Sequence, residues 1–189
     1  MTVTLHHPEV YAPEADTYLL CETALNECRP GERVLEVGTG SGYIAAQLSK
    51  RAFVVATDIS PHAVREACRA GVAVVRTDLF SGICGLFNLV VFNPPYLPTR
   101  EDERLDDWLE YALDGGEDGR QVIQRFACEV RRILGRDGRI LLLISSLTGL
   151  PEVTLLFENE GFESEILEKR TVFDEDLFVL RIRDNGREH

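Results

Sequence analysis

Short apolar runs alternate with segments of helical periodicity along most of this chain, and this alternation constrains the fold more than any other feature. Apolar runs suited to buried strands occur at residues 33–37, 53–57, 72–75, 86–92 and 139–144. Segments with helical spacing of apolar residues, or with helix-capping residues, occur at 15–27, 43–50, 60–70, 119–134 and 151–160. Strands that alternate with helices indicate βαβ units, which build a parallel sheet covered by helices on both faces.

Two further strand-like runs follow at residues 163–170 and 177–182, and only a short acidic segment joins them. A parallel pairing would need a crossover of about a dozen residues, so these two strands are expected to pair antiparallel. The sequence therefore predicts an α/β fold with a doubly wound, seven-stranded Rossmann-like sheet, mostly parallel with an antiparallel C-terminal hairpin. In such a sheet, ligands bind outside the carboxyl ends of the strands.

Length and composition favour a single domain that spans residues 1–189, since 189 residues suffice to bury a substantial core. The net charge of −12 argues against sequence-independent capture of DNA or RNA, so no direct nucleic-acid binding is expected. No apolar stretch approaches the roughly 20 residues of a membrane span, and no signal-peptide pattern begins the chain. We therefore expect a cytoplasmic protein without a membrane segment.

The scattered cysteines lack metal-ligand spacing, so no metal site is predicted.

A glycine-rich turn follows the first predicted strand, in the sequence VLEVGTGSGYIA. Gly38, Gly40 and Gly42 let the backbone turn sharply and approach a bound molecule, with the start of a helix just behind. The spacing G-x-G-x-G, preceded by Glu36, differs from the dinucleotide fingerprint G-x-G-x-x-G. The alternative is a tight strand-to-helix turn that binds nothing.

Two aspartates follow the next two predicted strands. Asp58 ends the second strand, where a carboxylate can accept hydrogen bonds from both hydroxyls of a ribose. Asp78 follows the third strand, where it could accept from an adenine amino group, and the adjacent Ile59 and Leu79 are included in the predicted site. Each aspartate could instead be a helix cap or a turn residue. Together with the glycine turn, they indicate a site for an adenosine-containing ligand.

These residues resemble the S-adenosylmethionine site of the seven-stranded methyltransferases. The resemblance implies that the glycine turn meets the methionine part of S-adenosylmethionine, that Glu36 is also among the donor-binding residues, and that S-adenosylhomocysteine is the product. It also implies that Asp58 holds the ribose and that Asp78 lies beside the adenine. The family's strand order places the third strand at one edge of the sheet and the antiparallel seventh strand between the fifth and the sixth.

The sequence FNPPYLP ends the fourth predicted strand, at the position that faces the donor methyl in this family. Two adjacent prolines end a strand and stiffen the backbone. The side-chain oxygen of Asn93 and the backbone oxygen of Pro94 could accept both hydrogens of a planar amide or aromatic amine, while Tyr96 offers it a flat face. We predict that these three residues are catalytic and that Asn93 also contacts the donor. The alternative is a proline-rich turn that caps the strand.

Two more segments, YAPEADTYLL at residues 11–20 and DGGEDGR at 114–120, resemble the HemK-type protein glutamine methyltransferases. These enzymes methylate the glutamine side chain in the Gly-Gly-Gln motif of class I peptide-release factors. The resemblance covers essentially the whole chain. We expect the short form of archaea and eukaryotes, without the additional N-terminal helical domain of bacterial members, since the first predicted helix begins near residue 15. Segment 114–120 could equally serve only to start the following helix.

The resemblance also implies roles for the N-terminal segment. Tyr11, Pro13, Asp16 and Thr17 match the motif that closes over the donor. The family usually has Glu directly before this Asp, whereas here Ala15 takes that position and a Glu stands one residue earlier. The alternative for this segment is a first helix capped near Asp16.

Short-form members need a small zinc-binding activator protein that pairs with an edge strand. In this chain the edge strand would begin at Val72 and end at Arg76 (residues 72–76), although it could also be an ordinary protected edge. The acidic segment 101–110, which contains Trp108, could meet a basic partner or simply face solvent.

Three other functions stay open at this point. The rigid corner formed by residues 93–96 would also suit an amino-methyltransferase of adenine or guanine in DNA or RNA, but the net charge and the short chain disfavour that function. A non-catalytic donor-binding subunit would have no need of Asn93 or of the glycine turn. Methylation of a protein lysine is a third alternative, although two acceptors suit an amide better than an ammonium group.

Overall fold

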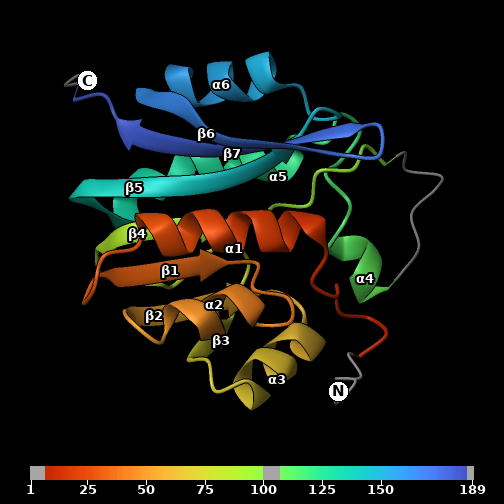
Figure 1. Ribbon diagram of the computed structural model, residues 1–189, viewed down its shortest axis with the longest axis vertical. Coiled ribbons are helices and arrows are strands. Elements are labelled where there is room, and N and C mark those ends of the chain that lie inside the picture. The colour runs from red at the N-terminus through yellow and green to blue at the C-terminus, as the bar shows by residue number, and fades with distance from the viewer. Residues whose placement is uncertain (1–6, 100–106, 187–189) are drawn as a thin grey trace.

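The computed structural model describes residues 7–99 and 107–186 of the chain. They form a seven-stranded sheet with the strand order β3-β2-β1-β4-β5-β7-β6 (Figure 1). The strands are β1 (Arg33–Val37), β2 (Phe53–Asp58), β3 (Val74–Arg76), β4 (Phe87–Phe92), β5 (Leu134–Ser145), β6 (Phe162–Val172) and β7 (Glu175–Asp184). Strands β1 to β5 are mutually parallel, and β7 runs antiparallel to β5 and β6. The predicted fold class and strand order are confirmed.

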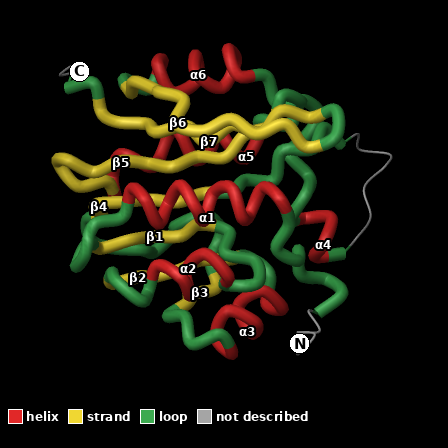
Figure 2. The backbone as a smooth tube through the Cα atoms, viewed as in Figure 1, coloured by secondary structure: helices red, strands yellow, loops and turns green. Residues whose placement is uncertain are grey.

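Helices cover both faces of this sheet (Figure 2). They are α1 (Ala15–Glu27), α2 (Tyr43–Leu48), α3 (Pro61–Arg69), α4 (Trp108–Tyr111), α5 (Gln121–Glu129) and α6 (Leu150–Asn159), and one 3₁₀ turn (Val130–Ile133) follows α5. Helices α1 to α3 pack on one face, and α5 and α6 pack on the other. None of the helices in the described residues is long and apolar enough to cross a membrane.

Strand β5 shows why its sequence is apolar at consecutive positions. Ile140, Leu142 and Ile144 belong to the core under α5 and α6, whereas Leu141 and Leu143 belong to the core under α1 to α3. All five side chains are fully buried. Side chains of a strand point alternately to the two faces of a sheet, so a strand covered on both faces has no polar side.

The expected bounds of the edge strand and of the helix before β5 are wrong for identifiable local reasons. The edge strand was expected to begin at Val72, but β3 begins at Val74. The backbone N–H of Val72 donates to the carbonyl of Ala67, so Val72 belongs to the turn that ends α3, and its side chain is buried. The helix expected at 119–134 is shorter, because a 3₁₀ turn replaces its last turn and Leu134 already pairs with Phe87 in the sheet.

Buried Arg139 of β5 anchors the C-terminal end of α1. Its side chain is 4% exposed and forms ion pairs with Glu27 (3.3 Å) and Glu32 (2.9 Å), and it also donates to the backbone oxygens of Glu27 and Asn88. Helix α1 has 13 residues and is therefore about 20 Å long. Figure 1 shows that it starts at the carboxyl edge of the parallel strands and runs back towards this anchor. The anchor thereby helps to place the first turn of α1 at the carboxyl edge.

Replacing Arg139 with alanine would leave Glu32 without its buried cationic partner. We expect Arg139→Ala to lower the free energy of unfolding by ~3–5 kcal/mol, measured by urea denaturation. Arg170→Ala, which removes an exposed pair with Glu22, is the matched control and should cost less than ~1 kcal/mol. Equal losses in the two variants would contradict the anchoring role.

Candidate active site

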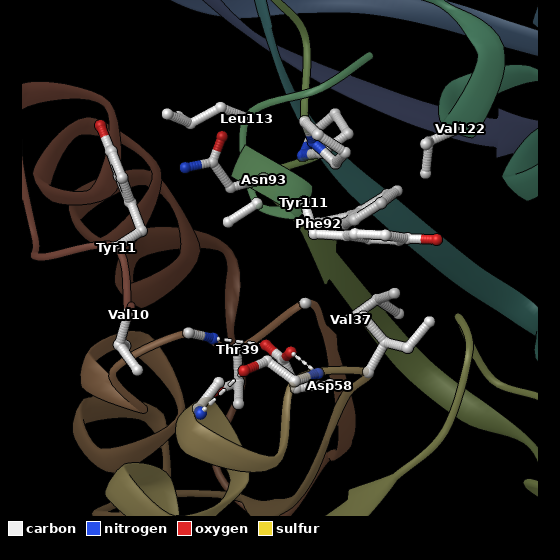
Figure 3. A pocket seen from close by; sticks show the side chains of 18 of the residues that line it. Val10, Tyr11, Val37, Thr39, Asp58, Phe92, Asn93, Tyr111, Leu113 and Val122 are labelled. Carbon is white, nitrogen blue, oxygen red and sulfur yellow. Dashed lines mark hydrogen bonds between the residues drawn. The ribbon is translucent and has the colours of Figure 1, made fainter. Parts of the chain in front are cut away.

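A cavity lies at the carboxyl ends of β1, β2 and β4, where the predicted ligand site was expected (Figure 3). Most of the residues predicted from the sequence line it, namely Tyr11, Asp16, Thr17, Glu36, Gly38, Gly40, Asp58, Ile59, Asp78, Leu79, Asn93, Pro94 and Tyr96. Pro13 and Gly42 do not line it. Segments far apart in the sequence are thus brought around one cavity.

The glycine turn between β1 and α2 has positive φ angles at Gly38 (64°), Gly40 (55°) and Gly42 (79°), a region that favours glycine. Gly38 also lets the turn lie against the ring of Phe92, because an added Cβ would be 3.4 Å from it. An added Cβ at Gly42 would lie 2.7 Å from Cα of Ala67. Gly42 therefore allows α3 to pack closely behind the turn, rather than opening the cavity.

Glu36 stabilises this turn from within the core. Its side chain is buried, and one carboxylate oxygen accepts from the hydroxyl of Thr39 (2.5 Å) and from the backbone N–H of Ala45 (3.0 Å). The carboxylate thus joins the end of β1 to the turn and to α2. Burial raises the pKa of Glu36 to about 8, although these two hydrogen bonds act in the opposite direction.

Asp58 is held by the backbone at the end of β2. One oxygen accepts from the N–H of Gly40 (2.8 Å) and the other from the N–H of Ser60 (2.8 Å) (Figure 3). Burial raises the pKa of this carboxyl, and the backbone hydrogen bonds oppose the rise. A carboxylate has about four acceptor positions, so each oxygen of Asp58 retains capacity for one more hydrogen bond.

Asp78 faces a partner that was not anticipated from the sequence. Its carboxylate forms an ion pair with Arg125 of α5 (2.5 Å), and the two side chains are about half exposed. Leu79 follows with a positive φ of 48°, a left-handed conformation that is uncommon for a residue other than glycine. On the same side of the cavity, the guanidinium of Arg76 lies 5.9 Å from the ring centre of Trp108.

The N-terminal segment meets the cavity through Tyr11 and the first turn of α1. Asp16 is 4% exposed and accepts from the hydroxyl of Tyr11 (3.2 Å) and from the backbone N–H of Thr17 (2.5 Å). Glu14 occupies the N-cap position, is exposed, and forms no side-chain capping bond.

The corner after β4 joins this segment through a single hydrogen bond. Asn93 Nδ2 donates to Asp16 Oδ2 at 3.0 Å. Its other end, Oδ1, is buried and has no hydrogen-bond partner within the described residues. In Figure 3 the amide nitrogen points towards Tyr11 and the amide oxygen points towards Leu113. Burial and the nearby carboxylate of Asp16 raise the pKa of Tyr96, which stays neutral and capable of donating a hydrogen bond.

Residues 114–120 hold the corner in place instead of serving only to start α5. The backbone of Leu97 pairs with Leu113 (3.0 Å) and with Gly115 (2.9 Å). Gly119 lies so close that an added Cβ would be 2.4 Å from the carbonyl oxygen of Tyr96. Glycine is therefore required at this position if the segment is to pack against the corner.

Several cavity residues were missed by sequence reasoning. Helix α4 contributes Trp108 and Tyr111, and only the tryptophan in its acidic segment gave any sequence signal. Residues 101–106 of that segment lie outside the described residues.

A contact outside the cavity was also missed. His7 and His62 stack with ring centres 4.1 Å apart, which places the N-terminal segment against α3. Their separation in the sequence gave no indication of this contact.

Folding couples to protonation at Glu36. Because the pKa rises from 4.5 to about 8, the stability contributed by protonated Glu36 is full below about pH 4.5 and is lost as the pH rises through about 8. Glu36→Gln does not titrate. Between about pH 5 and about pH 8, its free energy of unfolding should therefore decrease less than that of the wild type, measured by urea denaturation. Glu22→Gln, which alters an exposed residue, should retain the wild-type pH dependence, and a wild-type slope in Glu36→Gln would contradict the assignment.

Comparisons with known proteins agree with this geometry. The family model described as the methyltransferase small domain matches residues 4–107. A putative protein N5-glutamine methyltransferase of Methanocaldococcus jannaschii is 38% identical over 182 residues, which cover 92% of this chain and 91% of that protein. Methyltransferase HEMK2 of Mus musculus is 34% identical, with 92% and 89% covered. A release factor glutamine methyltransferase of Deinococcus radiodurans is 36% identical, but the match spans only 60% of that longer protein.

Comparison with solved structures supports the same family and fold. The Mtq2–Trm112 complex of E. cuniculi, described as responsible for methylation of the termination factor eRF1, aligns with a TM-score of 0.80 and 32% identity. This alignment covers 93% of the present chain and 99% of that chain. A ribosomal protein L11 methylase of Lactobacillus delbrueckii, at 21% identity and a TM-score of 0.67, shares the fold. The chain belongs to the HemK-type protein glutamine methyltransferases, within the S-adenosylmethionine-dependent methyltransferases of Rossmann-like fold.

Proposed function

We propose that this chain transfers a methyl group from S-adenosylmethionine to the side-chain amide nitrogen of a glutamine, in the Gly-Gly-Gln motif of a class I peptide-release factor. The observation that carries this proposal is Asn93 Oδ1, a buried acceptor at the end of β4 without a partner in the described part of the chain. Buried polar atoms almost always have hydrogen-bond partners, so an unpaired acceptor in a cavity indicates a donor on the substrate. The names of the relatives from M. jannaschii and D. radiodurans support a protein glutamine as that substrate.

The cavity fits S-adenosylmethionine. The glycine turn exposes its backbone to the methionine part, and Asp58 retains acceptor positions for the two ribose hydroxyls. Asp78, Ile59 and Leu79 line the part of the cavity that we assign to the adenine. When bound, the donor supplies an electrophilic methyl group on a sulfonium and leaves as S-adenosylhomocysteine. The proposed donor-binding residues are Tyr11, Thr17, Glu36, Gly38, Gly40, Asp58, Ile59, Asp78, Leu79 and Asn93. Pro13 and Gly42 do not line the cavity and would shape the site from behind it. Asp16 lines the cavity, but it is already bonded to Tyr11, Thr17 and Asn93 and would act through them.

The corner compensates for the weak nucleophilicity of an amide. The lone pair of an amide nitrogen is delocalised, and positive charge develops on this nitrogen as it attacks the methyl. Asn93 Oδ1 and the carbonyl oxygen of Pro94 would accept its two hydrogens and stabilise this charge. The prolines preset the two acceptors, so no ordering is needed during the reaction. Tyr96 would pack against the flat amide, and the surplus proton can leave after transfer.

A nucleic-acid amino-methyltransferase is the competing function, but no observation favours it. The relatives with the cited names are protein methyltransferases, and the chain carries a net charge of −12. We further propose that residues 1–189 form one methyltransferase domain and that it works in the cytoplasm, where release factors act.

Removing the Asn93 amide should abolish most of the activity. We expect Asn93→Ala to lower kcat by about 10²–10³-fold, the range seen when one preorganised hydrogen-bonding group is lost from an active site. The assay measures labelled methyl transfer to a release factor and to its Gln→Asn variant, with total tRNA and duplex DNA in parallel. Asn88→Ala is the matched control, because Asn88 lies at the other end of β4 and is exposed.

Each outcome of this assay points to a substrate. Label on the factor that is lost in the Gln→Asn variant supports the glutamine assignment. Label on tRNA or DNA alone would replace it with the competing function. Donor binding without label on the factor or on nucleic acid would contradict the release-factor assignment and leave the methyltransferase site in place.

We also propose a small zinc-binding activator protein as a partner on β3. The E. cuniculi relative was solved as a complex with Trm112. Strand β3 is the edge of the sheet, is three residues long, and exposes Val75 to 43%. An edge strand has unpaired backbone groups to which a partner can add a strand.

A charged side chain on β3 should weaken the binding of this partner. We expect Val75→Asp to reduce co-purification with a co-expressed zinc-binding activator and to raise the Kd of the complex by about tenfold or more, since it places a charge in an interface core. Phe173→Asp is the control, because Phe173 is 98% exposed on the β6–β7 hairpin at the opposite edge. Unchanged binding by Val75→Asp would place the partner elsewhere.

A further inference from the structure

Asp16 has an arrangement that helix capping alone does not explain. It lies in the first turn of α1, is 4% exposed, and receives hydrogen bonds from three residues. Tyr11 Oη lies 3.3 and 3.2 Å from its two oxygens, and the Thr17 hydroxyl lies 3.2 Å from Oδ1. The third residue, Asn93, comes from another element 77 positions away and donates to Oδ2. A capping role would account for the bond from the Thr17 N–H, but not for the bond from Asn93.

The direction of that last bond matters for chemistry. The two ends of an amide side chain have nearly the same shape, but one end only accepts hydrogen bonds and the other only donates. If Asn93 were turned by half a rotation, its NH₂ would face the N–H groups of the target. An ionised carboxylate only accepts, so Asp16 can pair with the amide in a single orientation.

The charge of Asp16 has a second effect. A hydrogen bond to an ionised acceptor is shorter and stronger than one between neutral groups. By attracting the proton of the Nδ2–H, the carboxylate leaves more electron density on the amide and makes its oxygen a better acceptor, because linked hydrogen bonds reinforce one another. Tyr11 and Thr17 satisfy the remaining lone pairs of Asp16, so the carboxylate itself stays fixed.

We propose that Asp16 is a positioning residue of this enzyme: its carboxylate orients and polarises the Asn93 amide so that Oδ1 faces the target nitrogen. The inference rests on the proposed function, in which Oδ1 accepts a hydrogen from the substrate amide. It assigns to Asp16 an action through Asn93 instead of contact with donor or substrate.

An exchange of the two side chains tests the inference. Asp16→Asn removes the fixed orientation, and Asn93→Asp places two carboxylates next to each other. In the double variant, the amide introduced at position 16 can donate to the carboxylate introduced at position 93, whose other oxygen still accepts from the target. The expected results are a kcat at least tenfold lower in each single variant and a donor KM changed by less than about threefold in Asp16→Asn. The double variant should recover at least tenfold over Asn93→Asp alone.

Two controls separate positioning from folding. Glu22→Gln, an exposed acid on the same helix, should retain wild-type kcat. The melting temperature is measured for every variant. If Asp16→Asn fails to fold, Tyr11→Phe takes its place, because it loosens Asp16 without changing charge. It should lower kcat and shift the side-chain N–H resonances of Asn93.

A spectroscopic measurement separates this inference from the proposed function. In protein labelled with ¹⁵N-asparagine, the Asn93 side-chain N–H resonances should exchange with solvent more slowly than those of exposed Asn88. Asp16→Asn should shift them and Asp16→Ala should remove the protection, whatever the substrate is. Additive losses in the double variant, or Asn93 resonances unchanged by Asp16→Asn and Asp16→Ala, would overturn the positioning role. Failure of wild-type glutamine methylation with these shifts present would overturn the proposed function alone.

Discussion

The chemistry of this enzyme depends on a rigid polar corner that a buried strand delivers to the open edge of a parallel sheet. Strand β4 is central and covered on both faces, so its position is set by the two cores. Its last residue packs against the glycine turn, and the next residue, Asn93, pairs with Asp16 at the start of α1. Residues 114–120 press on the other side through Gly119. The corner is therefore held from three directions before any ligand binds, as preorganised catalysis requires.

Three of the carboxylates that line the cavity, those of Asp16, Glu36 and Asp58, have different hydrogen-bond partners. Asp58 accepts from backbone N–H groups alone, Glu36 accepts from one hydroxyl and one backbone N–H, and Asp16 accepts mainly from side chains, including that of Asn93. Burial raises the pKa of Glu36 and of Asp58, which means that their charged forms lack full compensation within the protein. A sulfonium donor carries positive charge, and its binding would lower both pKa values. The acidic lining thus suits a cationic ligand. Methyl transfer converts the sulfonium into an uncharged sulfide, and the loss of this charge favours release of the product.

Local sequence signals predicted the fold and most of the candidate residues that line the cavity, because strand–helix alternation, the glycine turn and the Asn-Pro-Pro-Tyr corner are local features. What they could not supply was the pairing of distant side chains. Nothing in the sequence joins Asp16 to Asn93, or Asp78 to Arg125, since these contacts depend on how α1 and α5 lie against the sheet. Gly42 was expected to meet the ligand, but its role is to let α3 approach, which a spacing rule does not distinguish. Val72 was assigned to the edge strand because it is β-branched. Its backbone N–H instead bonds to Ala67, so it belongs to the turn that ends α3.

The most direct measurement is a crystal structure of this chain with S-adenosylhomocysteine and a peptide that contains the Gly-Gly-Gln motif. The proposed mechanism predicts that the glutamine amide nitrogen faces the sulfur of the product. Its two hydrogens should be accepted by Asn93 Oδ1 and by the carbonyl oxygen of Pro94, while Asn93 Nδ2 remains bonded to Asp16. A glutamine bound through its amide oxygen, or an Asn93 side chain rotated away from Asp16, would contradict the mechanism.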